Sequence, residues 1–195
     1  KMKKVIIGPD FTMGHNKSGT NITLPKLGSE MGFSVLSMQS VNDSSNYQIS
    51  STAIRQEIKS GNLESANLQL GRSFSLEGTV VKGMERGRTL GYPTANLQTN
   101  TMNIVIPGDG IYATKTLVDE TLYLSATSIG TQPTFGENKR TIESHLINFS
   151  KNLYNKRISI QFEKRIRDQK HFASVIELQK QISKDIEETQ KILYT

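Results

Sequence analysis

The chain has no cysteine and no tryptophan, and only 5 of its 195 residues are proline. Without cysteine it has no disulfide framework, no thiolate nucleophile and no zinc–thiolate site. It has no apolar run approaching the roughly eighteen residues of a membrane span, so we expect no membrane partner. The absence of disulfides favours a cytoplasmic location.

Neither sign of charge dominates strongly. Lys and Arg number 24 and Asp and Glu 18, which gives a formal net charge of +6 at pH 7. Such an excess could attract nucleic acid, anionic lipid or phosphorylated small molecules, but scattered cations more often form a solvated surface. With 35% hydrophobic and 22% charged residues the composition is that of a globular protein of one or two small domains.

The pattern of residues changes near position 72. Before it, short apolar runs alternate with segments of helical spacing, which is typical of an α/β arrangement. We expect strands over Val5–Ile7 and Phe33–Met38, a helix over Leu24–Met31, and two further helices that begin at Ser51 and Asn62. Residues 1–71 are therefore expected to form one domain.

After residue 72 the pattern is that of β-structure. Apolar and polar residues alternate over Phe74–Val81, and four more strands are expected over Ile111–Val118, Leu122–Ile129, Glu143–Phe149 and Arg157–Glu163. Several short strands in about a hundred residues indicate a small antiparallel barrel or sandwich. Residues 72–195 are therefore expected to form a second domain.

A helix is expected at the end of this second domain. Ser174 and Glu177 form a Ser-x-x-Glu capping box at its start. An apolar stripe at helical spacing follows, and we expect it to pack against the barrel. The stripe consists of Val175, Leu178, Ile182, Ile186 and Leu193.

A basic, glycine-rich segment lies between the first two stretches of the β-region. Gly83, Gly87 and Gly91 alternate with cations that include Arg86 and Arg88. Glycines let a backbone approach phosphate oxygens, which the cations would neutralise. The segment matches neither the P-loop nor the G-x-G-x-x-G pattern. An ordinary inter-strand loop is thus an equally simple interpretation.

The tetrapeptide Pro93–Asn96 follows that segment directly. In an extended chain Thr94 and Asn96 point to the same face. A hydroxyl and an amide oxygen are hard ligands that suit Mg²⁺. By spacing alone, a metal pair and two ordinary turn and strand residues are equally good interpretations.

A carboxylate opens the segment Glu143–Phe149, where alternation places Glu143 on one face with His145, Ile147 and Phe149. Such a group is a surface residue or a general base. His145 has no second histidine at ligand spacing, so we interpret it as a packed residue. Farther on, Arg165–Phe172 is either a charged connection or a contact for a planar or anionic ligand.

These stretches, taken together, resemble a known family. In order along the chain, segments 80–97 (VVKGMERGRTLGYPTANL), 129–135 (IGTQPTF), 143–149 (ESHLINF) and 165–172 (RIRDQKHF) resemble the riboflavin kinase domain. Segments 8–19 (GPDFTMGHNKSG) and 49–55 (ISSTAIR) resemble the later part of an FMN adenylyltransferase module. The whole resembles the bacterial bifunctional riboflavin kinase/FAD synthetase family.

The resemblance implies an α+β protein of two parts. Residues 72–195 would be a riboflavin kinase domain, a small Greek-key-like antiparallel barrel with a C-terminal helix. Residues 1–71 would be the C-terminal part of a Rossmann-like nucleotidyltransferase, without its HxGH-type segment, keeping Asp10, Ser51, Thr52 and Arg55. We expect adenylyl transfer to be lost or impaired. The strand edge at Val5–Ile7 could support self-association.

The resemblance also implies a reaction, in which ATP and riboflavin give FMN and ADP with Mg²⁺. It assigns Glu143 as the general base and Thr94 and Asn96 as the Mg²⁺ ligands. Its implied ATP contacts are Gly83, Arg88, Gly91, Thr94 and Asn96, and its flavin contacts are Arg167, Lys170 and Phe172. Small molecules are then the expected partners.

Three alternatives stay open. Adenylyltransferase activity could survive, and FAD formation from ATP and FMN would reveal it. The domain could bind flavin without catalysis. A basic barrel could also bind nucleic acid, although the chain has no tryptophan and its aromatic residues are spread along it rather than paired for base stacking. We expect no nucleic-acid partner.

Overall fold

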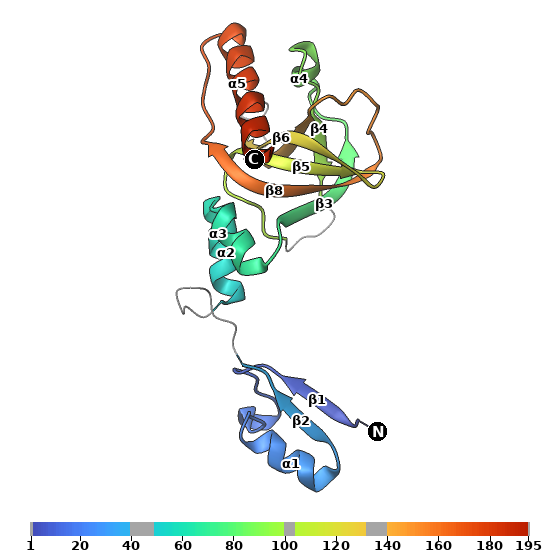
Figure 1. Cartoon of the computed structure of the whole chain (residues 1–195), viewed down its shortest axis with the longest axis vertical. Helices are drawn as coiled ribbons and strands as arrows, with labels where there is room; N and C mark the ends of the chain where they lie inside the picture. The colour runs from blue at the N-terminus through green and yellow to red at the C-terminus, as the bar shows by residue number, and fades with distance from the viewer. Residues whose placement is uncertain (1, 40–48, 100–103, 132–139, 195) are drawn as a thin grey trace. The chain divides into compact units, whose positions relative to one another are not determined.

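A computed structural model describes residues 2–39, 49–99, 104–131 and 140–194. The chain divides into two compact units, Lys1–Ser50 and Ser51–Thr195. Figure 1 shows the elements of each unit.

The first unit is a strand–helix–strand arrangement. Its elements are β1 (Lys4–Ile7), the 3₁₀ turn η1 (His15–Lys17), α1 (Thr23–Met31) and β2 (Ser34–Ser37). The two strands are parallel, with Val5 opposite Val35. Helix α1 packs tightly on the chain that follows it, because a Cβ at Gly28 would lie 2.6 Å from the Phe33 carbonyl oxygen. The predicted elements of this region are confirmed.

Helices α2 (Ser51–Ser60) and α3 (Leu63–Leu70) belong to the second unit. Ile58, Leu63 and Ala66 are part of its hydrophobic core. The Asn67 side chain holds α3 to the barrel, since it donates to the Phe162 carbonyl at 2.8 Å and accepts from the Phe74 N–H at 2.7 Å. The boundary between the two compact units therefore lies after residue 50, whereas the sequence pattern changes near residue 72. Assigning residues 51–71 to an adenylyltransferase module stays a prediction.

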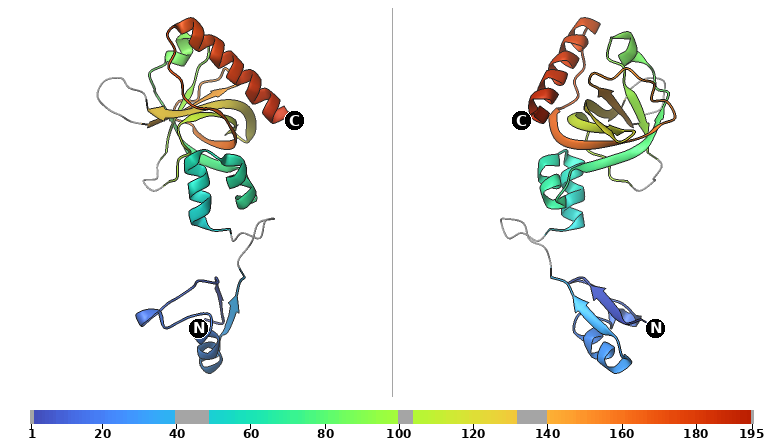
Figure 2. Two further views of the ribbon diagram at one scale, coloured as in Figure 1. Left: turned by 90° about the vertical axis from the view of Figure 1, so that its left-hand side faces the viewer. Right: turned by 45° about the vertical axis from the view of Figure 1, so that its right-hand side comes forward.

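The second unit contains a closed antiparallel barrel, as predicted, but with six strands rather than the five expected, in the order β3-β4-β7-β6-β5-β8. Its strands are β3 (Phe74–Val81), β4 (Ala95–Gln98), β5 (Gly110–Val118), β6 (Thr121–Thr131), β7 (Arg140–Leu146) and β8 (Arg157–Arg167). Two helices complete the unit, α4 (Arg86–Thr89) and α5 (Val175–Tyr194). Helices α4 and α5 lie at one end of the barrel and α2 and α3 at the other (Figure 2).

The strand around Glu143 differs from its prediction. It begins at Arg140 and ends at Leu146, and the chain then turns through Asn148, which has a φ of 58°. Within β7 Glu143 shares its half-exposed face with Thr141 and His145, while the alternate residues are buried. The prediction that Glu143 shares a face with Ile147 and Phe149 is therefore wrong, because the alternation stops at the turn.

Two other boundaries were misjudged from the sequence. Strand β8 continues to Arg167, so the first three of the eight residues of the expected connection Arg165–Phe172 are strand. The glycine-rich segment contains the short helix α4 rather than only a loop. Of the segment 129–135 that carried part of the family resemblance, residues 132–135 lie outside the described residues.

The interior of the barrel is partly polar. Five fully buried hydroxyl side chains from β5, β6 and β7 hydrogen-bond to one another at 2.7 to 3.2 Å. They belong to Thr114, Thr116, Ser125, Thr127 and Ser144. Because every member has a partner, the network avoids the cost of burying an unpaired polar group.

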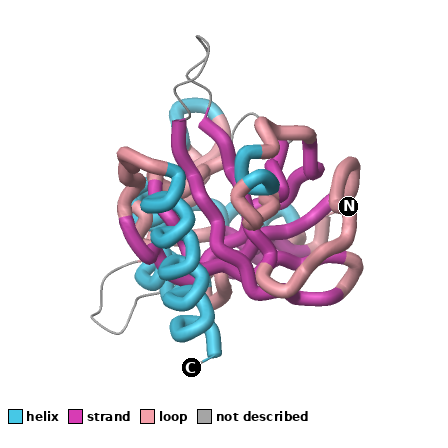
Figure 3. The backbone as a smooth tube through the Cα atoms, turned by 90° about the horizontal axis from the view of Figure 1, so that it is seen from above, coloured by secondary structure: helices cyan, strands magenta, loops and turns pink. Residues whose placement is uncertain are grey.

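Helix α5 begins where the capping box predicted. The Ser174 Oγ accepts from the Glu177 N–H at 3.2 Å, and the Glu177 carboxylate accepts from the Ala173 N–H at 3.2 Å. The helix packs against β5, β6 and β8, as expected, and Figure 3 shows it beside the strands. Its apolar stripe is not what is buried, however. The buried residues of α5 are Asp185 and Thr189, whereas Val175 is 59% exposed.

Candidate active site

The glycine-rich segment connects β3 to β4 and approaches β4 closely. A Cβ at Gly83 would lie 2.3 to 2.5 Å from the amide atoms of the Asn96 side chain. A Cβ at Gly87 would lie 2.4 Å from the Tyr92 carbonyl oxygen, and Gly91 has a φ of 86°. At each of these positions a steric or conformational constraint therefore favours glycine. Together the three glycines let the segment fold back over β4.

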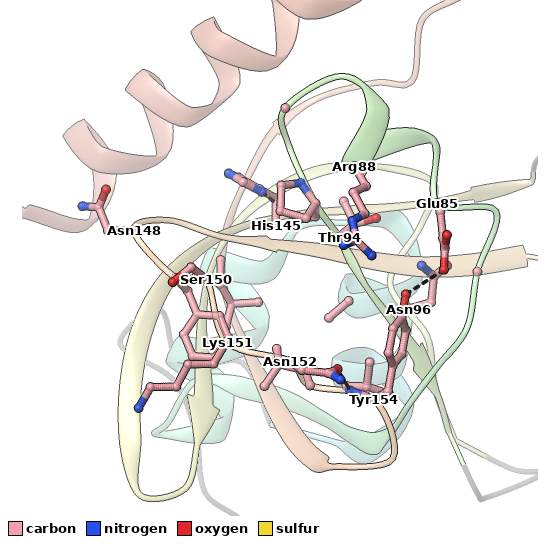
Figure 4. A pocket seen from close by; sticks show the side chains of 18 residues that line it. Glu85, Arg88, Thr94, Asn96, His145, Asn148, Ser150, Lys151, Asn152 and Tyr154 are labelled. Carbon is pink, nitrogen blue, oxygen red and sulfur yellow. Dashed lines mark hydrogen bonds between the residues drawn. The ribbon is translucent and has the colours of Figure 1, made fainter.

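A cavity of about 640 Å³, here called the glycine-loop cavity, opens beside this segment. All five residues predicted to contact ATP line it, namely Gly83, Arg88, Gly91, Thr94 and Asn96. Figure 4 shows Arg88, Thr94 and Asn96 on one side of it. A backbone free of side chains beside an exposed guanidinium is a suitable environment for phosphate oxygens.

The opposite wall of the glycine-loop cavity comes from the turn after β7, which the sequence analysis missed. The wall contains Asn148, Ser150, Lys151, Asn152 and Tyr154. The Tyr154 hydroxyl donates to Glu85 Oε1 at 3.0 Å, and this hydrogen bond raises the pKa of Tyr154. The signal in the sequence was the asparagine-rich stretch between the strands, since Asn148 and Asn155 both adopt positive φ.

Thr94, Asn96 and Glu143 come together at the β4–β7 pairing. Asn96 lies directly opposite Glu143 in the register. The Thr94 hydroxyl donates to Glu143 Oε2 at 3.0 Å, and the Thr141 hydroxyl approaches Glu143 Oε1 at 3.4 Å. The predicted shared face of Thr94 and Asn96 is present, because both are half-exposed on either side of buried Ala95.

His145 lies at the same place, two residues after Glu143 on β7. Its Nδ1 is 2.8 Å from the Pro93 carbonyl oxygen, and its ring meets the Tyr92 ring edge-on with centroids 5.6 Å apart. These contacts fit the expected packed histidine. They also place its ring at the junction of the cavities, because it lines both the glycine-loop cavity and the one described next.

A second cavity of about 780 Å³, here called the helix cavity, lies between the barrel and α5. Its volume falls in the range of about 300–1,000 Å³ typical of small-ligand pockets. The predicted flavin contacts Arg167, Lys170 and Phe172 line it, and so does Glu143. Its apolar wall explains the half-exposed stripe of α5, since it contains Val175, Leu178, Ile182 and Ile186.

The two cavities meet at Thr94 and His145, which line both. Glu143 faces the helix cavity and accepts its hydrogen bond from Thr94. The arrangement therefore offers two adjoining compartments with one carboxylate at their junction. Such geometry suits a transfer between two bound molecules.

The residues at the junction fit a magnesium ion shared with a substrate. Thr94 and Asn96 offer a hydroxyl and an amide oxygen, the hard donors that Mg²⁺ prefers. Within the described part of the chain, no three His, Asp or Glu side chains gather into a metal site. Thr94 and Asn96 are the residues that would hold such an ion.

Of the four residues predicted for the nucleotidyltransferase remnant, Ser51, Thr52 and Arg55 belong to the same unit as the two cavities and line neither. Asp10 is exposed in the turn after β1. Ser51, Thr52 and Arg55 are exposed in the first turns of α2. Their predicted role in adenylyl transfer stays a prediction.

Comparison with known proteins gives relatives over nearly the whole chain. The chain is 37% identical to the bifunctional riboflavin kinase/FMN adenylyltransferase of Escherichia coli K12 over 95% of its length, and 36% identical to that of Bacillus subtilis over 96%. It spans 58% and 59% of these two relatives. A solved Streptococcus pneumoniae structure, titled a macrolide-efflux protein, superposes with a TM-score of 0.83 at 34% identity. That match covers 95% of this chain and 60% of the other.

None of the described helices combines the length and the apolar character that a bilayer crossing requires.

The FAD synthetase family model matches residues 1–53. The riboflavin kinase family model matches residues 70–193, which include the whole barrel, all of α5 but its last residue, and the residues that line both cavities. On this match over more than half of its length, the chain belongs to the riboflavin kinase family.

Proposed function

We propose that the chain transfers the γ-phosphoryl group of ATP to the ribityl 5′-hydroxyl of riboflavin, giving FMN and ADP. The observation that carries the proposal is the junction of the two cavities at the Thr94–Glu143 hydrogen bond. Two substrates need two compartments, and a carboxylate where they meet can act on the group that is transferred. An ATP-dependent biosynthetic reaction also fits the expected cytoplasmic location.

The glycine-loop cavity is proposed to hold ATP. Gly83 and Gly91 leave room for the triphosphate beside the backbone, and Arg88 supplies a positive charge to it. The turn after β7 offers amide, hydroxyl and ammonium groups on the other side, at Asn148, Ser150, Lys151 and Asn152.

The helix cavity is proposed to hold the flavin. A planar ring system needs a flat apolar slot with a few polar anchors. Phe172 and the α5 side chains Leu178 and Ile182 provide apolar surface, and Lys170 provides an ammonium group.

In the proposed step the ribityl 5′-oxygen attacks the γ-phosphorus, and a P–O bond to this oxygen forms. The bond between the γ-phosphorus and the oxygen that bridges to the β-phosphate breaks, and ADP leaves with that oxygen. Glu143 accepts the proton of the 5′-hydroxyl. The Thr94 hydrogen bond at 3.0 Å orients the accepting carboxylate. Positioning is most of what phosphoryl transfer requires from a protein.

Thr94 and Asn96 would hold Mg²⁺, which when bound neutralises phosphate charge during the transfer. The close packing of Gly83 on the Asn96 amide orients this donor toward the glycine-loop cavity. Thr94 can serve both purposes, because its hydroxyl proton goes to Glu143 while its oxygen keeps a lone pair for the metal.

We also propose that this chain by itself makes little or no FAD. The FAD synthetase family model matches only residues 1–53, whereas the riboflavin kinase family model matches residues 70–193.

One assay tests both proposals. The purified chain is incubated with riboflavin, ATP and Mg²⁺, and riboflavin, FMN and FAD are separated by chromatography. We expect FMN and ADP in equal amounts and no FAD. Accumulation of FAD would overturn the second proposal. Riboflavin binding without FMN formation would overturn the first and leave a non-catalytic flavin-binding module.

A further inference from the structure

A buried ion pair joins α5 to the barrel at the helix cavity. Arg167 at the end of β8 donates from Nε to Asp185 Oδ1 at 2.8 Å and from Nη2 to Oδ2 at 2.6 Å. The two side chains are only 14% and 6% exposed. Gln181 donates to the same carboxylate at 2.9 Å. This bidentate geometry is the strongest form of an arginine–carboxylate contact.

The remaining contacts of Arg167 are also within the protein. Its Nη1 donates to the Asp168 carbonyl at 2.8 Å, and its guanidinium carbon lies 5.9 Å from the centre of the Phe172 ring. All three guanidinium nitrogens therefore donate to protein oxygens. An arginine committed in this way has few donors left for a ligand.

The pair lies where it can set the width of the helix cavity. Asp185 is flanked on α5 by Ile182 and Ile186, which line the cavity, and the apolar stripe itself is largely half-exposed. The stripe is therefore only partly buried against the barrel. The Arg167–Asp185 pair supplies a directional contact, and burying these charges is tolerable only while both partners are in register.

A second contact fixes the connection between β8 and α5. Gln169 donates to the Ile129 carbonyl at 2.9 Å and to the Ser128 hydroxyl at 3.1 Å. This contact requires a glycine beneath it, because a Cβ at Gly130 would lie 2.3 Å from Gln169 Nε2. Because the side chains of Arg167 and Gln169 are both hydrogen-bonded within the protein, the backbone that leads to Lys170 and Phe172 is held in place.

We infer that Arg167 and Asp185 are a pair of positioning residues that hold α5 at the distance a planar flavin requires. The inference rests on the proposed function of the helix cavity and changes the role given to Arg167. Arg167 acts through Asp185 and Phe172, and does not act by donating to the flavin.

The test compares Arg167→Met, Asp185→Asn and the double variant Arg167→Met/Asp185→Leu. Riboflavin affinity is measured without catalysis, from the quenching of riboflavin fluorescence, and KM and kcat are measured for both substrates. Each single variant is expected to weaken riboflavin binding about tenfold, the equivalent of about 1.4 kcal/mol. We expect kcat at saturation and KM for ATP to change less than twofold.

The double variant separates positioning from direct contact. If the residues act as a pair, the double variant weakens riboflavin binding no more than either single variant does. It also remains informative if a single variant fails to fold, because replacing both charges by apolar groups of similar size is often neutral for stability. Arg157→Met is the matched control, since Arg157 pairs with Glu77 at 2.8 Å on the exposed surface and lines neither cavity.

Four outcomes would overturn the inference. Weak riboflavin binding in Arg167→Met with normal binding in Asp185→Asn would mean that Arg167 contacts the flavin directly. A lower melting temperature with unchanged riboflavin affinity would mean that the pair is only structural. If the unaltered chain binds no riboflavin, the proposed function fails and the inference fails with it. If the unaltered chain makes FMN and the pair variants bind riboflavin as tightly as it does, the inference fails while the proposed function stands.

Discussion

The Thr94 hydroxyl donates to the Glu143 carboxylate at 3.0 Å although the two residues are 49 positions apart in the chain. The contact depends on the pairing of β4 with β7, in which Asn96 lies opposite Glu143 and Ala95 opposite Ser144. A slip of one residue in that register would turn Glu143 toward the barrel interior. The register of two strands therefore determines whether a carboxylate reaches the junction of the two cavities.

The first prediction concerns Glu143. Glu143→Gln keeps the size of the side chain and removes the proton acceptor, so we expect kcat to fall by roughly 10²–10⁴-fold. Riboflavin affinity, measured by fluorescence quenching, should stay within about twofold because the shape of the helix cavity is kept. Glu77→Gln on the exposed face of β3 is the control. Unchanged turnover in Glu143→Gln would exclude the general-base role.

The second prediction concerns Thr94 and Asn96. Removing one of two protein ligands should raise the Mg²⁺ concentration needed for half-maximal FMN formation by about tenfold, as expected for a loss of about 1.4 kcal/mol. The variants are Thr94→Val and Asn96→Ala, and Thr94→Ser is the matched control because it keeps the hydroxyl. A Mg²⁺ titration of initial rates measures the effect. Identical Mg²⁺ dependence in all variants would reject the ligand assignment.

The third prediction concerns Gly83. Its φ lies outside the left-handed region, so alanine is conformationally acceptable, but the added Cβ would lie within 2.5 Å of the Asn96 amide. Gly83→Ala must therefore displace Asn96, and we expect kcat/KM for ATP to fall by about tenfold to a hundredfold. Gly8→Ala is the control, because nothing lies within 4 Å of the Cβ added there. Equal kinetics in the two variants would contradict the proposed role of this contact.

The fourth prediction concerns the hydroxyl network inside the barrel. The Thr127 hydroxyl donates to Ser144 Oγ at 3.0 Å and also forms a hydrogen bond with the Thr114 hydroxyl at 2.7 Å. Thr127→Val keeps the side-chain shape and leaves buried partners unsatisfied, so we expect the free energy of unfolding to fall by about 1–3 kcal/mol. Urea denaturation measures it, with exposed Thr121→Val as the control. A loss no larger than that of the control would show that the network contributes little to stability.

The fifth prediction concerns alkaline pH. Burial is the main cause of a raised pKa for Tyr112, whose hydroxyl donates to the Gly108 carbonyl at 2.6 Å. The unfolded chain then ionises near pH 10 while the folded chain still binds the proton, so stability falls as pH rises from about 10 through the folded pKa. Melting temperatures between pH 8 and 11 should fall less steeply for Tyr112→Phe. Parallel curves would contradict this linkage.

Much of the fold followed from local patterns. Alternation over Phe74–Val81 and Arg157–Glu163 predicted two strands that the structure contains. Glycines 32 and 71 lie at the C-terminal ends of helices, in left-handed conformation, where short-range chemistry predicts them. Boundaries were less predictable. β7 stops at Leu146 although apolar alternation continues, because the turn through Asn148 is required by the return to β8.

The sequence predicted which kinds of residue form the centre of the site, but not which residues line its two cavities. The segments containing Gly83, Thr94, Asn96 and Glu143 carry recognisable chemistry, so the sequence could point to them. The turn residues 148–154 carry polar groups but form no recognisable motif, and the α5 residues Leu178 and Ile182 are apolar. They become part of a site only because the closed barrel brings them to its cavities.

By itself the sequence determined the kind of protein. The strand periodicity and the capping box are local patterns, and the absence of cysteine and the order of the motifs can be read directly from the chain. Only the tertiary structure decided that Thr94 orients Glu143, that the stripe of α5 walls a cavity, and that Arg167 pairs with Asp185. Each of these contacts joins positions far apart in the chain or on separate elements. They depend on strand register and barrel closure, which no window of neighbouring residues specifies.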